Sequence, residues 1–187
     1  MPYSITLPRL FRNSIMSHPD FSAAFSGLYR RALARFGAGN ATPATLLALT
    51  DVALLTANGI TAQHVFDYVE DFTNHGEPSY DEALAIELVR RDYFLNVQHG
   101  RPSATVLDAA TLPPKNATIS GIGWLPRLLP KARAKLRGEL PQSMMFCCGG
   151  DRAFFQRHRL AAHDFLALIS RHEHDDTAII EWVRQGA

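Results

Sequence analysis

The chain has 187 residues, of which 47% are hydrophobic and 20% charged, and its formal net charge at pH 7 is +1. This composition is typical of a globular protein with a sizeable core. It excludes a disordered chain, which would carry fewer apolar residues and more net charge. The near-neutral charge also excludes an overall electrostatic bias toward nucleic acid.

Neither a membrane span nor a secretory signal is predicted. No apolar run approaches the roughly 18 residues that a membrane span needs, and the N-terminal segment has no continuous apolar stretch. The two cysteines, Cys147 and Cys148, are adjacent, which excludes a disulfide framework. We therefore expect a protein of the reducing cytoplasm.

Four helices are predicted in residues 1–100. Each predicted helix is a run of apolar residues at helical spacing, and the runs end at glycines. Serine, threonine and proline mark helix starts, because the hydroxyl can cap free N–H groups and proline fits the first turn. The starts are Ser17 or His18 before Pro19, Thr42 before Pro43, Thr61, and Ser79 with Glu82 in a capping box.

Residues 101–123 differ from the rest of the chain because they contain Pro102, Pro113 and Pro114 among small polar residues. This composition predicts a loop or linker, with one short extended piece at Ala104–Leu107. A loop of this length is often functional or marks a boundary between domains.

Four shorter helices are predicted in residues 124–187. The first is a basic helix over Leu125–Gly138, in which Pro130 should lie in the first turn or cause a kink. The others follow Gly149, cover Ala162–Arg171, and begin at Asp175 or Asp176. The sequence thus predicts an all-α multi-helix bundle, with an N-terminal four-helix region (1–100) packed through the linker (101–123) on a smaller helical C-terminal unit (124–187).

The C-terminal half also carries a recognisable series of short motifs. They are Gly123-Trp124-Leu125-Pro126-Arg127, Lys131-Ala132-Arg133-Ala134, Gly138, Asp151, Phe154-Phe155 and Glu181-Trp182-Val183. In these residues the chain resembles an uncharacterised bacterial family, the domain of unknown function 5069, over about residues 120–185. The resemblance implies kinship, but it brings no established activity, cofactor or catalytic residue.

The basic helix is the first candidate site. Arg127, Lys131 and Lys135 are spaced i, i+4 and i+8 and therefore share one face of the helix. Such a row can hold a phosphate or carboxylate, and it can equally be a solvated surface. We expect Trp124, Arg127, Lys131 and Arg133 to bind an anionic small molecule, with Asp151, His75 and Asp92 as candidate catalytic residues.

Two further clusters have chemical potential. Cys147 or Cys148, before a predicted helix, could be a reactive thiol with His158 or His163 as its base, and the alternative is a pair of buried small apolar side chains.

The polar turn that contains His172 and His174 could chelate a metal ion or simply be solvated. The sequence contains neither His-Glu-x-x-His nor the two Glu-x-x-His pairs of a di-iron bundle. We therefore predict no metal and no other cofactor.

Two charge patterns in the first half complete the candidates. His64, Asp67 and Asp71 are spaced i, i+3 and i+7 and share a face of the third helix. Glu87 is expected to form a surface ion pair with Arg90 or Arg91.

Two functions follow. One is binding of an anionic small molecule in a cleft between the two halves, with general acid/base catalysis if the protein is an enzyme. The alternative is a non-enzymatic helical interaction module, homodimeric, whose basic face meets an acidic partner.

Overall fold

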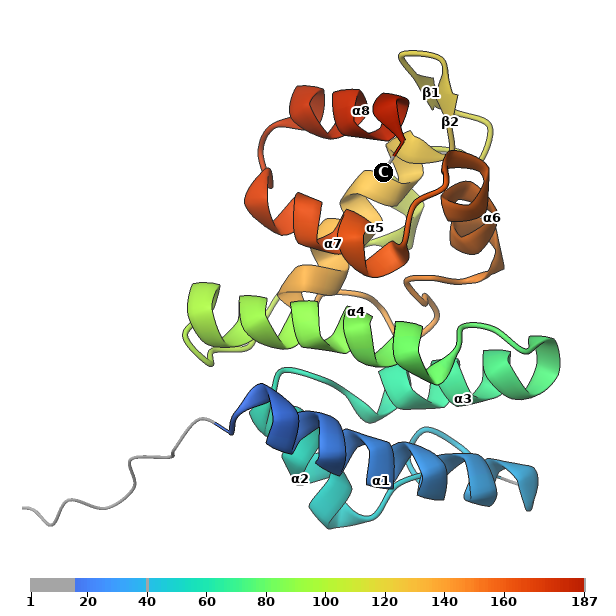
Figure 1. The fold of residues 1–187 in the computed structure, drawn as a ribbon, viewed down its shortest axis with the longest axis vertical. Coiled ribbons are helices and arrows are strands. Elements are labelled where there is room, and N and C mark those ends of the chain that lie inside the picture. The colour runs from blue at the N-terminus through green and yellow to red at the C-terminus, as the bar shows by residue number, and fades with distance from the viewer. Residues whose placement is uncertain (1–15, 40, 187) are drawn as a thin grey trace, which may run out of the picture.

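A computed structural model describes residues 16–39 and 41–186 of the chain (Figure 1). The described part is mostly helical, and its only sheet is a two-stranded hairpin, so the all-α prediction is confirmed. The α-helices are α1 (His18–Gly37), α2 (Leu49–Ala57), α3 (Ala62–His75), α4 (Tyr80–Asp92), α5 (Leu125–Arg137), α6 (Gly149–His158), α7 (Ala162–Arg171) and α8 (Asp176–Gln185). The hairpin pairs β1 (Thr118–Ile119) with β2 (Ile122–Gly123) in antiparallel register.

The helices are stacked along the long axis of the molecule. Figure 1 shows α1 and α2 at one end, α3 and α4 across the middle, and α5 to α8 with the hairpin at the other end. Helix α1 packs on α3, whereas α4 packs on α7 and α5. The contact between the two halves of the chain is thus made largely by α4.

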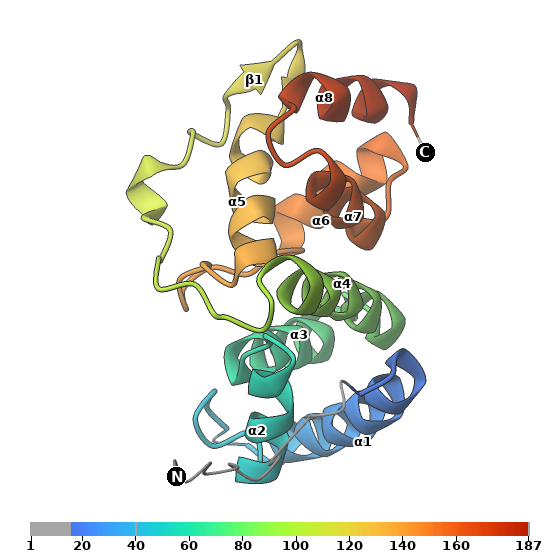
Figure 2. The same ribbon diagram turned by 90° about the vertical axis from the view of Figure 1, so that its left-hand side faces the viewer.

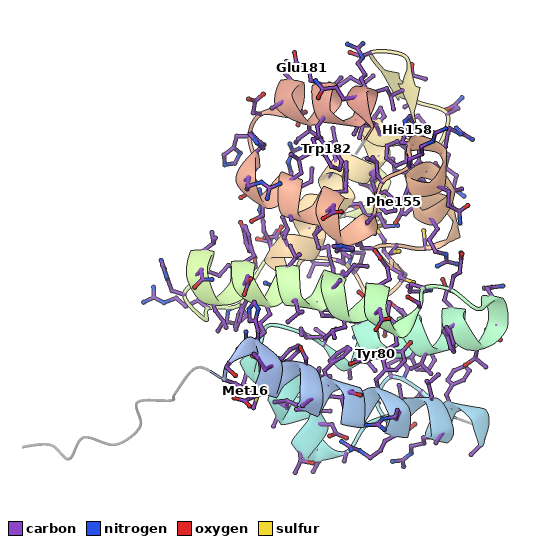
Figure 3. All side chains as sticks on the ribbon, in the orientation of Figure 1. Met16, Tyr80, Phe155, His158, Glu181 and Trp182 are labelled. Carbon is purple, nitrogen blue, oxygen red and sulfur yellow. The ribbon has the colours of Figure 1, made fainter. Side chains whose placement is uncertain are left out.

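One hydrophobic core runs through both halves. It includes Phe25 of α1, Val65 of α3, Leu128 of α5 and Ile169 of α7, all of which are completely buried. Figure 3 shows Trp182 extending from α8 into the space beside α7, where it packs against this core. The continuity of the core holds the two halves in a defined relation.

The predicted helix starts are confirmed where a hydroxyl or carboxylate caps the helix. In each case the side chain accepts a hydrogen bond from the N–H of the third residue further along the chain, which satisfies one of the free donors of the first turn. The capping residues are Ser17, Thr61, Ser79 and Asp175.

The second predicted helix begins later than expected. Residues 42–48 form turns, and α2 starts at Leu49 rather than at Thr42. The N–H of Thr42 is bound by the Thr45 hydroxyl at 2.9 Å, and Ala48 has an extended backbone that separates this turn from the helix. A local side-chain hydrogen bond thus competes with the helix here.

The fourth helix changes its winding before it ends. From Tyr93 to Val97 the chain forms a π-helix, in which the N–H of Gln98 donates to the carbonyl of Tyr93. This turn is wider than an α-helical one. Residue spacing alone did not predict it.

The segment 101–123 passes along the outside of α5 to the hairpin (Figure 2). The extended piece expected at Ala104–Leu107 is not a strand, although the Leu107 N–H donates to the carbonyl of Glu139 at 2.8 Å. A short 3-10 helix at Ala109–Thr111 follows. In α5, Pro126 occupies the first turn, and Pro130 lies inside the helix instead.

Within the described residues, no helix is long and apolar enough to cross a membrane.

Candidate functional site

Asp151 is the centre of a buried polar unit at the start of α6. Its side chain is 0% exposed. Lys131 Nζ lies 2.6 Å from Oδ2, the Trp124 indole N–H donates to Oδ1 at 3.0 Å, and the Cys147 N–H donates to Oδ2 at 2.9 Å. Asp151 thus accepts hydrogen bonds from three donors and ties α5 to α6.

Close packing around Trp124 depends on a glycine. Trp124 has a positive φ of 68° just before α5, and its ring lies against the backbone of Gly150. A Cβ atom at Gly150 would lie 2.4 Å from the Trp124 ring. The glycine therefore allows the indole to reach Asp151.

A cavity of about 620 Å³ opens above this unit, and we call it the junction cavity because it lies between α3 of the first half and α5 and α6 of the second. Its acidic wall is formed by α3, and its basic wall by α5, α6 and the loops before them. The acidic-wall residues are Gln63, Asp67, Glu70, Asp71 and His75; the basic wall includes Lys115, Trp124, Arg127, Lys131, Cys148, Gly149, Gly150 and Arg152.

The structure brings together most of the candidate residues. Trp124, Arg127, Lys131 and His75 line the junction cavity, and Asp151 lies beneath its floor. These residues come from α3 and from the region of α5 and α6, which are far apart in the sequence.

Two candidates lie elsewhere. The Arg133 Nε–H donates to the carbonyl of Glu173 at 2.7 Å, and its guanidinium also pairs with Asp176 near the start of α8. Asp92 pairs with His18, whose Nε2 lies 2.7 Å from the carboxylate. Neither residue lines the junction cavity. Arg133 lies on a different face of α5 from Arg127 and Lys131, and Asp92 lies at the C-terminal end of α4, away from the cavity.

The basic wall offers donors for an anion. No side chain among the described residues caps the first turn of α6, which begins with Gly149 and Gly150, so backbone N–H groups at this end of the helix have no side-chain acceptor. Arg127 is half-buried and uses Nη1 to donate to the carbonyl of Pro113 at 3.0 Å. Among the described residues, its remaining N–H groups have no acceptor and can bind another one at the cavity.

The acidic wall contains one carboxyl group with altered acidity. Burial raises the pKa of Asp67 to about 6, and the hydrogen bond from Gln63 Nε2 at 2.6 Å only partly opposes this rise. Asp71, one turn further along α3, is bound by Arg152 Nη1 at 2.7 Å. Asp67 therefore differs from its neighbour in having no cationic partner within 4 Å among the described residues.

Asp67 was not among the catalytic candidates taken from the sequence. The signal that could have found it is the i, i+3, i+7 spacing of His64, Asp67 and Asp71, which places all three on one face of α3. That face meets α5 and the loop after it in the folded protein.

A second cavity of about 480 Å³ adjoins the junction cavity and shares Gln63, Gln142 and Met144 with it. We call it the His64 cavity, because His64 lines it.

Behind His64 lies a buried network. Lys135 Nζ is 2.5 Å from Glu87 Oε1 and 3.0 Å from His64 Nδ1, and the Tyr68 hydroxyl donates to the same Glu87 oxygen at 2.8 Å. The expected surface pair of Glu87 with Arg90 or Arg91 is therefore wrong, because α5 lies against α4 and buries Glu87 on Lys135.

The network determines the tautomer of His64. The Lys135 ammonium, 3.0 Å from Nδ1 of His64, has only donors, and Glu87 Oε1 is further from Nδ1 at 3.5 Å. We therefore assign the ring hydrogen to Nε2, with Nδ1 as the acceptor. Burial lowers the pKa of His64, and the nearby Lys135 charge lowers it further. Burial alone would raise the pKa of Glu87, but the charge of Lys135 outweighs it and lowers that pKa. His64 is thus a neutral N–H donor at neutral pH.

The basic face of α5 is largely covered. Lys131 is 5% exposed and Lys135 is 2% exposed, and each is paired with a buried carboxylate. Of the three residues on this predicted face, only Arg127 keeps partial exposure. Neither a solvated basic surface nor a charged docking face is formed by these lysines.

The two cysteines have different surroundings. Cys147 is buried, which raises the pKa of its thiol well above its usual range, whereas Cys148 lines the junction cavity with Sγ 3.2 Å from Lys131 Nζ. His158 packs against Phe154 with the two rings tilted, and His163 contacts Glu82. No cysteine–histidine hydrogen bond is present in residues 16–39 and 41–186.

In the same described ranges, no group of three or more histidine, cysteine, aspartate or glutamate side chains is arranged to hold a metal ion. The turn with His172 and His174 instead directs Glu173 toward α5. Arg137 Nε donates to Glu173 Oε1 at 2.7 Å, and the Tyr93 hydroxyl donates to Oε2 at 2.8 Å. The central residue of this turn thus binds α5 and the π-helix.

In a comparison with known protein families, the C-terminal part of the chain matches a family model. Residues 111–187 match the family model described as Domain of unknown function (DUF5069). The match confirms the resemblance seen in the sequence. No curated protein and no solved structure matches the chain.

The DUF5069 region includes the hairpin and α5 to α8. It therefore supplies the basic wall of the junction cavity, whereas α3 with Asp67 lies outside the matched residues. The candidate site is formed jointly by the DUF5069 region and the N-terminal helices.

Proposed function

We propose that the protein binds a small anionic molecule in the junction cavity and acts on it by general acid/base chemistry. The observation that carries the proposal is that Arg127 and the uncapped start of α6 face the same cavity as Asp67. The volume of about 620 Å³ is in the range of small-molecule sites.

The anionic group would lie at the basic wall. Backbone N–H groups at the start of α6 and the guanidinium of Arg127 are suitable donors for a phosphate or carboxylate. Lys131 is already neutralised by Asp151, so its role is to hold the wall in place and to add one donor. Trp124, fixed by its hydrogen bond to Asp151, offers an apolar surface beside these donors.

Proton transfer would belong to Asp67. A carboxyl group with a pKa of about 6 exchanges a proton readily near neutral pH, whereas an ordinary aspartate is almost entirely ionised there. His75, on the same wall, is a second group that could carry a proton. We also propose a cytoplasmic location, because both cysteines are free thiols in the folded chain.

Binding is tested by thermal shift with a panel of phosphates and carboxylates, followed by titration calorimetry for anions that raise the melting temperature. Arg127→Gln should weaken such an anion by about 10- to 100-fold, which is the loss of one or two charge-assisted hydrogen bonds. The matched control is Arg157→Gln, an exposed arginine of α6 outside the junction cavity. The proposal is wrong if no anion binds, or if both variants bind equally well.

Acid/base chemistry is tested without knowledge of the reaction. Anions that bind are incubated in D₂O with the protein, and exchange of carbon-bound hydrogen is followed by proton NMR. Asp67→Asn should abolish any exchange while the anion still binds. Glu70→Gln, on the same wall and exposed, should leave the exchange unchanged. Exchange that survives in Asp67→Asn would assign the proton transfer to another group.

A further inference from the structure

The His64 cavity differs in charge from the junction cavity that it adjoins. No aspartate, glutamate, lysine or arginine of the described residues lines it, whereas the junction cavity has an acidic and a basic wall. Its apolar lining includes Pro43, from the turns before α2, and Leu140 and Met144, from the loop after α5. With a volume of about 480 Å³, it is suited to an uncharged part of a small ligand.

One nitrogen of His64 is available to such a ligand. Nδ1 lies 3.0 Å from Lys135 Nζ in the buried network, so the ring hydrogen is on Nε2. Nε2 has no acceptor among the described residues and is not fully buried, and the side chain as a whole is 11% exposed. Since His64 lines the His64 cavity, it offers one unpaired N–H donor there.

The network behind His64 holds this donor in place. Lys135 is 2% exposed and lies between His64 Nδ1 and the completely buried Glu87. The Thr61 hydroxyl caps α3 and accepts from the backbone N–H of His64 at 3.3 Å, which fixes the residue in the first turn. The ammonium also polarises the imidazole and strengthens the N–H donor at Nε2. A fixed donor of this kind stabilises an oxygen that gains negative charge during a reaction.

Asp67 lies one turn further along α3 than His64, on the same face. Side chains at i and i+3 of a helix have Cβ atoms about 5–6 Å apart, so one small ligand can contact both. Gln63 lines both cavities and donates to Asp67 Oδ1 at 2.6 Å, and Oδ2 has no hydrogen bond among the described residues. The two adjoining cavities thus place a carboxylate and a neutral N–H donor within reach of the same ligand.

We propose that the ligand of the junction cavity is an anionic carbonyl compound, whose carbonyl oxygen accepts from His64 Nε2 and whose neighbouring carbon lies beside Asp67. The inference rests on the proposed function, and it adds the substrate class and a catalytic role for His64. The anionic group binds to Arg127 and the start of α6, as above. A carboxylate base and a neutral histidine donor together are suited to enolisation.

The reaction step is a proton transfer from carbon. The Asp67 carboxylate takes the proton from the carbon next to the carbonyl group, and the electron pair of that C–H bond forms a C=C bond. The π pair of the C=O bond moves to the oxygen, and the resulting enolate is held by the Nε2–H of His64. Return of a proton from Asp67 to carbon restores the carbonyl compound. Because Asp67 lines an open cavity, it exchanges its proton with solvent between the two steps.

Binding is tested by titration calorimetry of the full chain with dihydroxyacetone phosphate and with inorganic phosphate, which has no carbonyl group. His64→Ala should weaken dihydroxyacetone phosphate by about 3- to 10-fold, the loss of one hydrogen bond, and should leave inorganic phosphate unchanged. The matched control is His174→Ala, at an exposed position outside both cavities, which should change neither affinity. Equal effects of His64→Ala on the two ligands would overturn the proposal.

The chemical role is tested by hydrogen exchange in D₂O, followed by proton NMR. The wild type should exchange the carbon-bound hydrogens next to the carbonyl group of dihydroxyacetone phosphate. His64→Ala should lower the rate at saturating ligand by about 100- to 1,000-fold, which is typical for the loss of one donor to a developing oxyanion. Absence of exchange in the wild type, or an unchanged rate in His64→Ala, would overturn the proposal.

A measurement on the wild type decides the question even if His64→Ala does not fold. In protein with ¹⁵N-labelled histidine, dihydroxyacetone phosphate should shift the Nε2 resonance of His64, and inorganic phosphate should not. An unchanged resonance would contradict the contact.

The outcomes also separate this inference from the proposed function. If inorganic phosphate binds through Arg127 and dihydroxyacetone phosphate gains nothing from His64, only this inference is wrong. If neither phosphate binds, this inference is wrong, and the wider panel of anions decides the proposed function.

Discussion

Replacement of Asp67 by asparagine should make the protein more stable at neutral pH. The pKa of Asp67 rises from 3.8 to about 6 on folding, chiefly because the carboxylate is buried. At pH 7 the carboxyl group is ionised in both states, so the shift corresponds to about 3 kcal/mol of lost stability. The side chain keeps some contact with water, and we therefore expect a gain of about 1–2 kcal/mol from asparagine. Asparagine also keeps an oxygen that can accept the hydrogen bond from Gln63.

The pH dependence identifies the cause. A carboxyl group whose pKa is raised by folding stabilises the folded state fully below its unfolded pKa, and this stability is lost as the pH rises through the folded pKa. The advantage of Asp67→Asn should therefore be largest above pH 7 and should disappear as the pH falls from about 6 to about 4. Chemical unfolding followed by circular dichroism at pH 7.5, 6 and 4.5 measures this difference.

Two neighbours on α3 serve as controls. Glu70→Gln, at an exposed position, should change the free energy of unfolding by less than about 0.5 kcal/mol. Asp71→Asn should lower it, because Arg152 loses the closer of its two carboxylate partners and keeps only Glu77. The reasoning is refuted if Asp67→Asn is destabilising, or if its effect is the same at all three pH values. Asp67→Asn could be more stable than the wild type and yet no longer exchange the carbon-bound hydrogen of a bound anion. This result would show that the protein keeps a destabilising carboxylate for its function.

Three further variants test the buried contacts. Lys135→Met should lower the free energy of unfolding by about 3–5 kcal/mol, because it leaves the Glu87 carboxylate buried without its cation. The contribution of His64 to stability should fall as the pH drops below about 6.5, because its lowered pKa means that only the unfolded state gains this proton. Relative to the wild type, His64→Gln should therefore gain up to about 1.4 kcal/mol between pH 7.5 and pH 5.5. Gly150→Ala should cost about 1–3 kcal/mol by displacing Trp124, which its Cβ would meet at 2.4 Å, and indole fluorescence should report the displacement.

Each of these variants has its own control. Glu87→Leu combined with Lys135→Met removes both charges, and it should recover most of the stability lost in the single variant. Gly149→Ala places a Cβ no closer than 3.8 Å to a neighbouring side chain, so equal losses in both glycine variants would argue against the indole contact. A pH profile of His64→Gln that is the same as that of the wild type would show that His64 does not titrate as expected.

Much of the helical organisation follows from local chemistry. The caps of Ser17, Thr61, Ser79 and Asp175 are confirmed, because an N-cap depends on one side chain and the three residues after it. The C-terminal family resemblance is confirmed for the same kind of reason, since its motifs are short and contiguous. At Thr42, a hydrogen bond to the Thr45 hydroxyl competes with helix formation, and the helix start predicted there was wrong.

The site shows where local chemistry stops being informative. Helical spacing correctly put Arg127, Lys131 and Lys135 on one face, but it could not tell that the two lysines are buried on Asp151 and Glu87. Those partners lie on α6 and α4, and only long-range packing brings them to α5. The pKa of Asp67 depends on the same packing, since burial and neighbouring charges cause it.

The sequence by itself thus determined the helical class, the capped helix starts and the kinship of the C-terminal part. The tertiary structure alone decided which charges are buried, which cavity they line, and which of the candidates meet. The physical reason is that a helical face is set by residues three and four apart, whereas its burial and electrostatics are set by elements distant in the chain. Arg90 is the clearest example, because a surface position expected from spacing is a buried cation in the folded protein.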